Sequence, residues 1–202
     1  MLKGQRFLSE QYISEQAAAV LRKYFTKAPR ELPINVELVA EQLFDLLISW
    51  EALTDAEGTL TLGGVRPRTQ QLVLNDHARS YFAEFPGSEN FTKAHEIGHV
   101  TLHIAAEPAA APLFADVGPP AIVCTSADRK PPREIQADMF AAFFLMPEDL
   151  LRPECAGRVL DAWPPLYDLA AFLGVSITAL RIRLQGLGLI RVEGRRVTSL
   201  IP

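Results

Sequence analysis

Two histidines four residues apart, with a glutamate beside the first, constrain this chain more than any other feature. The run His95-Glu96-Ile97-Gly98-His99 lies within residues 90–103, whose pattern of apolar residues predicts a helix. Residues i and i+4 of a helix project from the same face one turn apart, so both imidazoles can reach one metal ion. Glu96 projects beside them, close enough to accept a proton from water at that ion.

A second pair at helical spacing supplies two carboxylates. Glu134 and Asp138 lie near the start of an apolar helix predicted over residues 132–145. Acidic side chains that face an apolar core are costly unless they have partners. Glu134 can bind the metal, while Asp138 accepts a hydrogen bond from a ligand histidine. Gly98 and Ala137 are small, so we expect the two helices to approach each other closely.

Zinc suits these ligands, although a site of two histidines and a carboxylate also accepts manganese. A catalytic zinc usually has three protein ligands and an open position for water. The candidates for the third ligand are Glu134, His103, His77 and Cys124. We expect His103 to lie just outside the ligand set and His77 at the rim of the cleft. Tyr81 and His77 are the candidates for stabilising an oxyanion.

The remaining patterns predict an α+β fold that is mostly helical. Helices are expected over residues 7–26 and after an N-cap at Asn35. Strand candidates separated by turn sequences predict a small antiparallel sheet of three strands. These candidates are residues 46–50, 59–63 and 71–75. Residues 104–131 are rich in Ala and Pro and are expected to form a lid or a partly disordered loop.

Residues 169–180 predict a helix-turn-helix, with Gly174 at the turn and Ser176 as the cap of the second helix. A hairpin follows, so the segment resembles a winged helix. The second helix is apolar and the basic patch is small, which favours a structural or substrate-docking role over DNA binding. The residues that are candidates for contact with DNA or substrate are Arg181, Arg183, Arg195 and Arg196.

The charge changes sign along the chain. The net charge of −4 argues against a protein that is basic all over for nucleic acid. Residues 1–150 carry 13 Lys and Arg against 20 Asp and Glu, whereas residues 151–202 carry 7 against 4. This change predicts a domain boundary near residue 150. No apolar stretch is long enough to cross a membrane, no signal peptide is recognised and the two cysteines form no cluster, so we expect a cytoplasmic protein without a membrane partner.

Two segments together resemble the ImmA/IrrE-type zinc metallopeptidases. The F-T-x-A-H-E-x-G-H segment of that family is matched by residues 91–99, and its E-x-x-A-N-x-F-A-A…L-M-P segment is matched by residues 134–147. The family is similar to thermolysin-like peptidases, which use a glutamate from a second helix as third ligand. One departure is Asp138, where the family usually has Asn; Asp should still accept the same hydrogen bond. The insertion at residues 75–90 is a second departure, and the Pro-rich loop is another.

With the boundary near residue 150, we expect a zinc-peptidase domain over residues 1–150 and a helix-turn-helix or winged-helix-like domain over residues 151–202. The resemblance covers roughly residues 8–190. It implies that His95, His99 and Glu134 bind zinc and that Glu96 is the general base. Family members act in bacteria and phages, where they cleave a helix-turn-helix repressor and so derepress stress, DNA-damage or mobile-element genes. The alternative is a regulator that binds DNA or a repressor, with a structural or sensing metal site and no peptidase activity.

Overall fold

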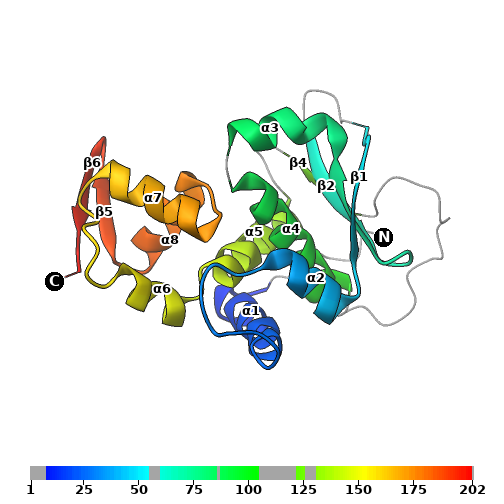
Figure 1. Cartoon of the computed structure of the whole chain (residues 1–202), viewed down its shortest axis with the longest axis horizontal. Coiled ribbons are helices and arrows are strands. Elements are labelled where there is room, and N and C mark those ends of the chain that lie inside the picture. Colours follow the sequence, from blue (N-terminus) through cyan, green and yellow to red (C-terminus); the bar gives the residue numbers. More distant parts are fainter. Residues whose placement is uncertain (1–7, 55–59, 86, 105–121, 126–130, 202) are drawn as a thin grey trace.

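The computed structural model describes residues 8–54, 60–85, 87–104, 122–125 and 131–201 (Figure 1). The α-helices are α1 (Glu10–Tyr24), α2 (Val36–Phe44), α3 (Arg79–Glu84), α4 (Ser88–His99), α5 (Pro132–Leu145), α6 (Glu148–Cys155), α7 (Trp163–Leu173) and α8 (Ile177–Gly186). The strands are β1 (Leu47–Glu51), β2 (Thr61–Arg66), β3 (Gln71–Asn75), β4 (Ile122–Thr125), β5 (Ile190–Glu193) and β6 (Arg196–Ser199). A 3₁₀ turn, η1 (Asp76–Ala78), precedes α3, and a π-helical turn, η2 (Val100–Ile104), follows α4. This mixture confirms the α+β fold.

The first two helices begin where the sequence supplies a cap. Ser9 accepts a hydrogen bond from the backbone of Tyr12 in α1, and Asn35 accepts one from the backbone of Leu38 in α2. The expected apolar face of α1 is buried, which confirms its period. Its buried residues are Ile13, Ala17, Val20, Leu21 and Tyr24.

The main sheet has four strands in the order β1-β3-β2-β4, so the predicted antiparallel meander of three strands is wrong. Only β2 and β3 form the expected hairpin. The preceding strand β1 lies on the far side of β3 and runs parallel to it, with Leu47 opposite Gln71. Residues 52–60 separate β1 from β2. This connection is longer than a tight hairpin turn, so β2 need not pair with β1, and β3 lies between them in the sheet.

The fourth strand comes from the stretch that was expected to be irregular. β4 pairs antiparallel with β2, where Cys124 lies opposite Gly63 and Val123 opposite Gly64. The expectation of a lid or loop is therefore wrong for residues 122–125. The neighbouring residues 105–121 and 126–130 lie outside the described part of the chain.

Helices cover the sheet in successive layers (Figure 1). α2 packs against β1, while α4 packs against β2 and β4. The approach of α4 is close at Gly63, where an added Cβ would lie 2.8 Å from the Val73 carbonyl oxygen and 3.0 Å from the Thr92 methyl. α5 packs on α4, and α1 packs on α5. The two helices that carry the histidine and carboxylate pairs are thus neighbours inside the fold.

The C-terminal part contains α6, α7, α8 and the β5–β6 hairpin, at the left of Figure 1. Gly174 ends α7 with φ of +64° and Ser176 caps α8, as predicted. The assignment as a winged helix stays a prediction, and so does the domain division at residue 150, a position that lies within α6. Among the described residues no single helix is long and apolar enough to span a membrane, although α7 and α8, bent by 103°, together meet that criterion of length and composition.

Candidate metal centre

α4 presents His95 and His99 from one face, and both side chains are completely buried. Burial follows from the packing of α5 across this face. A Cβ added to Gly98 would lie 3.1–3.2 Å from carbon atoms of Phe140, so the missing side chain lets the helices approach. Ala137 on α5 is also fully buried. These contacts confirm the expected close approach at two small residues.

α5 brings Glu134 against both histidines. Glu134 Oε2 lies 3.1 Å from His95 Nε2, and Glu134 Oε1 lies 3.2 Å from His99 Nε2. The two Nε2 atoms are themselves 2.9 Å apart. Ligand atoms of these three residues all lie within 4.8 Å of one another, so the group could hold a metal ion.

The hydrogen bond behind His95 shows why a cation fits this group. Asp138 Oδ1 lies 2.9 Å from His95 Nδ1, and the carboxylate can only accept, so the proton belongs on Nδ1. Nε2 of His95 then directs a lone pair toward Glu134 and His99. A proton or a metal ion must lie between such facing atoms, and a metal ion would bind all three of them at once. Ligand atoms about 2.0–2.1 Å from a tetrahedral zinc would be ~3.3 Å apart, close to the observed spacing.

Burial and contact also set the protonation states that a metal requires. Burial lowers the pKa of His99, and the nearby His95 acts in the same direction, although a hydrogen bond with Glu134 opposes it. Burial alone would raise the pKa of Glu134, but the close contacts of its carboxylate with the His95 and His99 rings outweigh burial and lower the pKa to about 2. A neutral imidazole and an ionised carboxylate are the forms that bind divalent metals.

Glu96 lies between the two histidines on α4 and is completely buried, including both carboxylate oxygens.

His103 lies in the turn η2, with its ring centroid 5.5 Å from that of His99 and its Nε2 3.4 Å from the Arg133 carbonyl oxygen. Burial and the nearby His99 lower the pKa of His103 to about 4. His103 is thus a buried neighbour of the three-residue group rather than a member of it.

Among the described residues, none of the other candidates belongs to the group of His95, His99 and Glu134. His77 is exposed in η1, and Tyr81 on α3 packs against Phe82 and Phe85. Cys124 lies in β4, but its side chain is outside the described part of the structure. Of the candidates for third ligand, the described structure therefore groups Glu134 with the two histidines.

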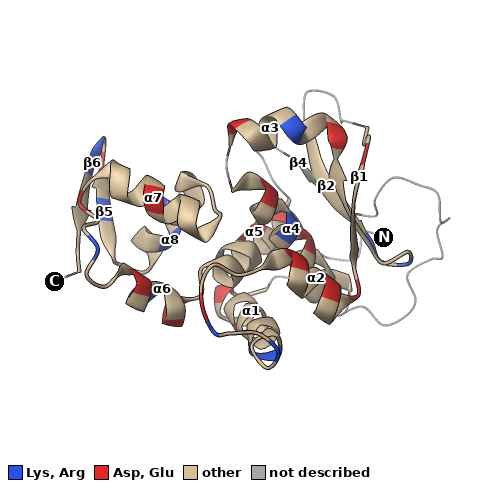
Figure 2. Ribbon diagram, viewed as in Figure 1, with Lys and Arg blue, Asp and Glu red and all other residues tan. Residues whose placement is uncertain are grey.

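The four arginines lie in two different environments. Arg195 and Arg196 are exposed at the turn of the β5–β6 hairpin. Figure 2 shows basic residues on this hairpin and acidic residues on α2. Arg181 and Arg183 are half-buried on α8. Arg181 Nη1 donates to Gln185 Oε1 at 3.1 Å, whereas Arg183 Nε donates to the Met146 carbonyl oxygen at 3.0 Å.

A buried lysine on α4 was not singled out from the sequence. Lys93 Nζ lies 2.5 Å from Glu37 Oε1 and 2.6 Å from Glu89 Oε1, and its side chain is 3% exposed. The contact with Glu37 ties α2 to the helix that carries both histidines. The i, i+4 spacing of Glu89 and Lys93 was the available signal.

Comparison with curated proteins gives no match. A family model, described as the IrrE N-terminal-like domain of the M78 peptidases, matches residues 54–185, more than half of the chain. The match includes both helices of the candidate metal centre and extends through most of α8. The chain therefore belongs to the IrrE N-terminal-like family of peptidases.

Proposed function

We propose that this chain is a zinc-dependent endopeptidase that cleaves a helix-turn-helix transcriptional repressor. The observation that carries the proposal is the convergence of His95, His99 and Glu134, whose ligand atoms lie within 4.8 Å of one another. Membership of a peptidase family supports hydrolysis of peptide bonds as the reaction. Cleavage of the repressor would switch on stress, DNA-damage or mobile-element genes.

Zinc would be held by His95 Nε2, His99 Nε2 and Glu134. When bound, it would supply a Lewis acid that polarises a peptide carbonyl and makes water more acidic. Manganese remains the second metal that this ligand set would take. Asp138 holds the His95 ring by accepting from Nδ1 and so keeps Nε2 free of a proton.

Glu96 is the proposed general base. Its carboxylate takes a proton from the attacking water and delivers it to the nitrogen of the leaving amine. The position of Glu96 immediately after His95 on a buried face of α4 supports this role, because the group is kept from bulk water beside the ligands. The Glu96 carboxylate would thus carry the same proton from the attacking water to the leaving amine.

Two measurements test the metal and the base separately. Elemental analysis should find about one zinc per chain in the wild type and much less in Glu134→Ala. Glu96→Gln should keep the zinc but lose cleavage. A Glu96→Gln protein with wild-type activity would contradict the mechanism, and a wild type that fails to bind added zinc would contradict the metal site.

The substrate is tested by labelling new N-termini. The wild type and Glu96→Gln are each added to an extract of the source cells, and the new termini are identified by mass spectrometry. We expect termini within a helix-turn-helix repressor only with the wild type. Termini spread over unrelated proteins would contradict the repressor specificity while leaving the peptidase in place.

The proposed alternative is a DNA-binding regulator that keeps the metal for structure or sensing. The exposed hairpin arginines Arg195 and Arg196 favour this reading. It requires salt-dependent binding to duplex DNA that weakens when both are changed to Gln. Arg181 is the further candidate for this contact. DNA binding by a chain without peptidase activity would replace the first proposal.

A further inference from the structure

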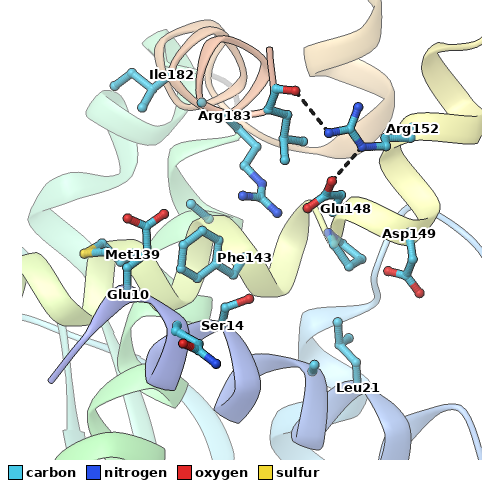
Figure 3. A pocket seen from close by; sticks show the side chains of 16 residues that line it. Glu10, Ser14, Leu21, Met139, Phe143, Glu148, Asp149, Arg152, Ile182 and Arg183 are labelled. Atoms are coloured by element: carbon cyan, nitrogen blue, oxygen red, sulfur yellow. Dashed lines mark hydrogen bonds and ion pairs between the residues drawn. The ribbon is translucent and has the colours of Figure 1, made fainter. Parts of the chain in front are cut away.

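A cavity of about 1100 Å³ lies between α1, α5, α6 and α8 (Figure 3). None of its lining residues belongs to the group His95, His99 and Glu134. Small-molecule sites usually occupy about 300–1,000 Å³, so this cavity is large enough for a segment of another protein. Its walls join the helices beside the metal centre to the C-terminal part of the chain.

Arg183 extends from α8 into this cavity. Its Nε donates to the Met146 carbonyl oxygen at 3.0 Å, and its guanidinium carbon lies 4.7 Å from the centre of the Phe143 ring. These two contacts hold the side chain in place and leave the terminal nitrogens facing the cavity, as Figure 3 shows. Across the described ranges of the chain, no carboxylate lies within ion-pair distance of Arg183.

The acidic groups around Arg183 have other partners or lie at the rim. Glu148 Oε1 accepts from Arg152 Nε at 2.6 Å, and Asp149 pairs with Arg30. Glu10 is exposed in the first turn of α1. Burial lowers the pKa of Arg183, while the charges of Glu148 and Glu10 act in the opposite direction. The half-buried guanidinium of Arg183 therefore has no carboxylate from the described residues that accepts from two of its nitrogens at once. Such a bidentate pair is the arrangement in which a guanidinium binds a carboxylate most strongly.

Apolar side chains form the rest of the surface that faces Arg183. Met139 and Phe143 contribute from α5, and Leu187 follows α8. Ile182 on α8 also lines the cavity, and its side chain is 59% exposed and open to contact by an occupant. An occupant that matches these walls carries one carboxylate with apolar groups on either side.

We infer that this cavity docks an acidic side chain, flanked by apolar residues, of the protein substrate. The carboxylate would bind the terminal nitrogens of Arg183, and the flanking residues would pack on Met139 and Ile182. That the docked protein is the substrate rests on the proposed function. That the cavity recognises a carboxylate flanked by apolar residues rests on the cavity's own side chains. The cavity then gives the peptidase a second point of contact that selects its substrate away from the scissile bond.

Methyl NMR on the full chain tests docking without cleavage. The chain has three methionines, so labelling their methyl groups with ¹³C gives few signals, and Met139→Leu assigns the one in the cavity. The probes are two short capped peptides, identical except for a central Leu-Asp-Leu or Leu-Asn-Leu. Glu96→Gln is used as the background so that neither peptide is cut.

We expect the Asp peptide to shift the Met139 signal. The Asn peptide should bind at least about tenfold more weakly than the Asp peptide. Arg183→Gln should weaken the Asp peptide to the level of the Asn peptide. Arg22→Gln is the matched control because Arg22 is exposed on α1 outside the cavity lining, and it should bind like the unaltered chain. The comparison of the two peptides needs no Arg183 variant, so it stands even if Arg183→Gln does not fold.

Three results would overturn the inference. Equal binding of both peptides, or no Met139 shift at millimolar peptide, would exclude recognition of the carboxylate. Tighter binding of free 4-phenylbutyrate than of the Asp peptide would make the cavity a small-molecule site. A Met139 shift that depends only on protein concentration would make it a contact between copies of this chain. If the wild type shows no zinc-dependent cleavage while the Asp peptide still binds in the cavity, the proposed function alone would be contradicted.

Discussion

Removing the carboxylate of Asp138 tests how the metal centre is held. His95 Nδ1 donates to Asp138 Oδ1 at 2.9 Å, and this bond fixes both the ring and its tautomer. Loss of such a partner typically lowers metal affinity about 10–100-fold. The side chain of Asp138 is 28% exposed, so water can replace part of the lost bond. We therefore expect Asp138→Ala to bind zinc about 10–30-fold more weakly than the wild type.

Asp138→Asn separates the hydrogen bond from the charge. The amide oxygen of Asn can still accept from His95 Nδ1, but the bond is no longer assisted by charge. Hydrogen bonds to charged groups contribute about 1.5–3 kcal/mol and neutral ones about 0.5–1.5 kcal/mol, a difference of ~1 kcal/mol. This difference corresponds to about fivefold in affinity. Asn should thus fall between the wild type and Ala.

Competition with a chromophoric chelator at neutral pH measures these affinities. Asp168→Asn makes the same chemical change at an exposed position of α7 and should bind zinc like the wild type. Circular dichroism of the zinc-free proteins checks that each variant is folded. Wild-type affinity in Asp138→Ala would refute the reasoning, and so would an Asn variant as weak as Ala, because the retained acceptor would then contribute nothing.

Three further predictions concern stability. The pKa of His103 falls from 6.5 in the unfolded chain to about 4 in the fold, so the unfolded chain takes up a proton first and stability is lost as the pH drops from 6.5 toward 4; urea unfolding with a chelator present should show a shallower loss in His103→Gln. In the zinc-free protein the pKa of Glu134 falls from 4.5 to about 2, so the stabilisation present above pH 4.5 is lost between 4.5 and 2; Glu134→Gln should remove this part of the acid profile. Gly98→Ala should cost ~1 kcal/mol, because overpacking against Phe140 at 3.1–3.2 Å exceeds the gain of about 1 kcal/mol in helix propensity. Thermal unfolding should show that Phe140→Leu recovers part of this loss, and a Gly98→Ala protein more stable than the wild type would show that Phe140 can move aside.

The helices were predictable because their signals are local. The apolar period of α1, the caps Asn35 and Ser176 and the glycine turn at Gly174 each act within a few residues, and the structure confirms them. The sheet was not predictable in the same way. Strand order depends on which edges meet after collapse, and the residues of a single strand do not indicate whether its neighbour is parallel or antiparallel. β4 was missed because it lies within a stretch whose composition indicates a loop.

The histidine pair of the candidate site was predictable for the same reason, because its signal also lies within one helix. The spacing of His95 and His99 places both on one helical face before any tertiary contact exists. The third member of the group depends on how two helices pack, and the spacing between residues 99 and 134 does not determine that packing. The residues alone left four candidates, whereas the resemblance named Glu134. The structure groups Glu134 with the histidines because α5 crosses α4 at Gly98.

Arg183 shows what the helical period adds to a prediction made from charge alone. Its basic side chain, close to Arg181, suggested a surface for DNA or substrate. Leu180 and Leu184 are completely buried on α8, and position 183 lies three residues after the first and next to the second, at the border of that apolar face. Position 181 lies at the opposite border of the same face, where the Arg181 side chain donates to Gln185 instead. A long arginine at such a border places its stem along the core and its charge at the nearest polar opening. In this fold that opening is the cavity lined by Phe143, so the same period that buries the leucines directs Arg183 into the cavity.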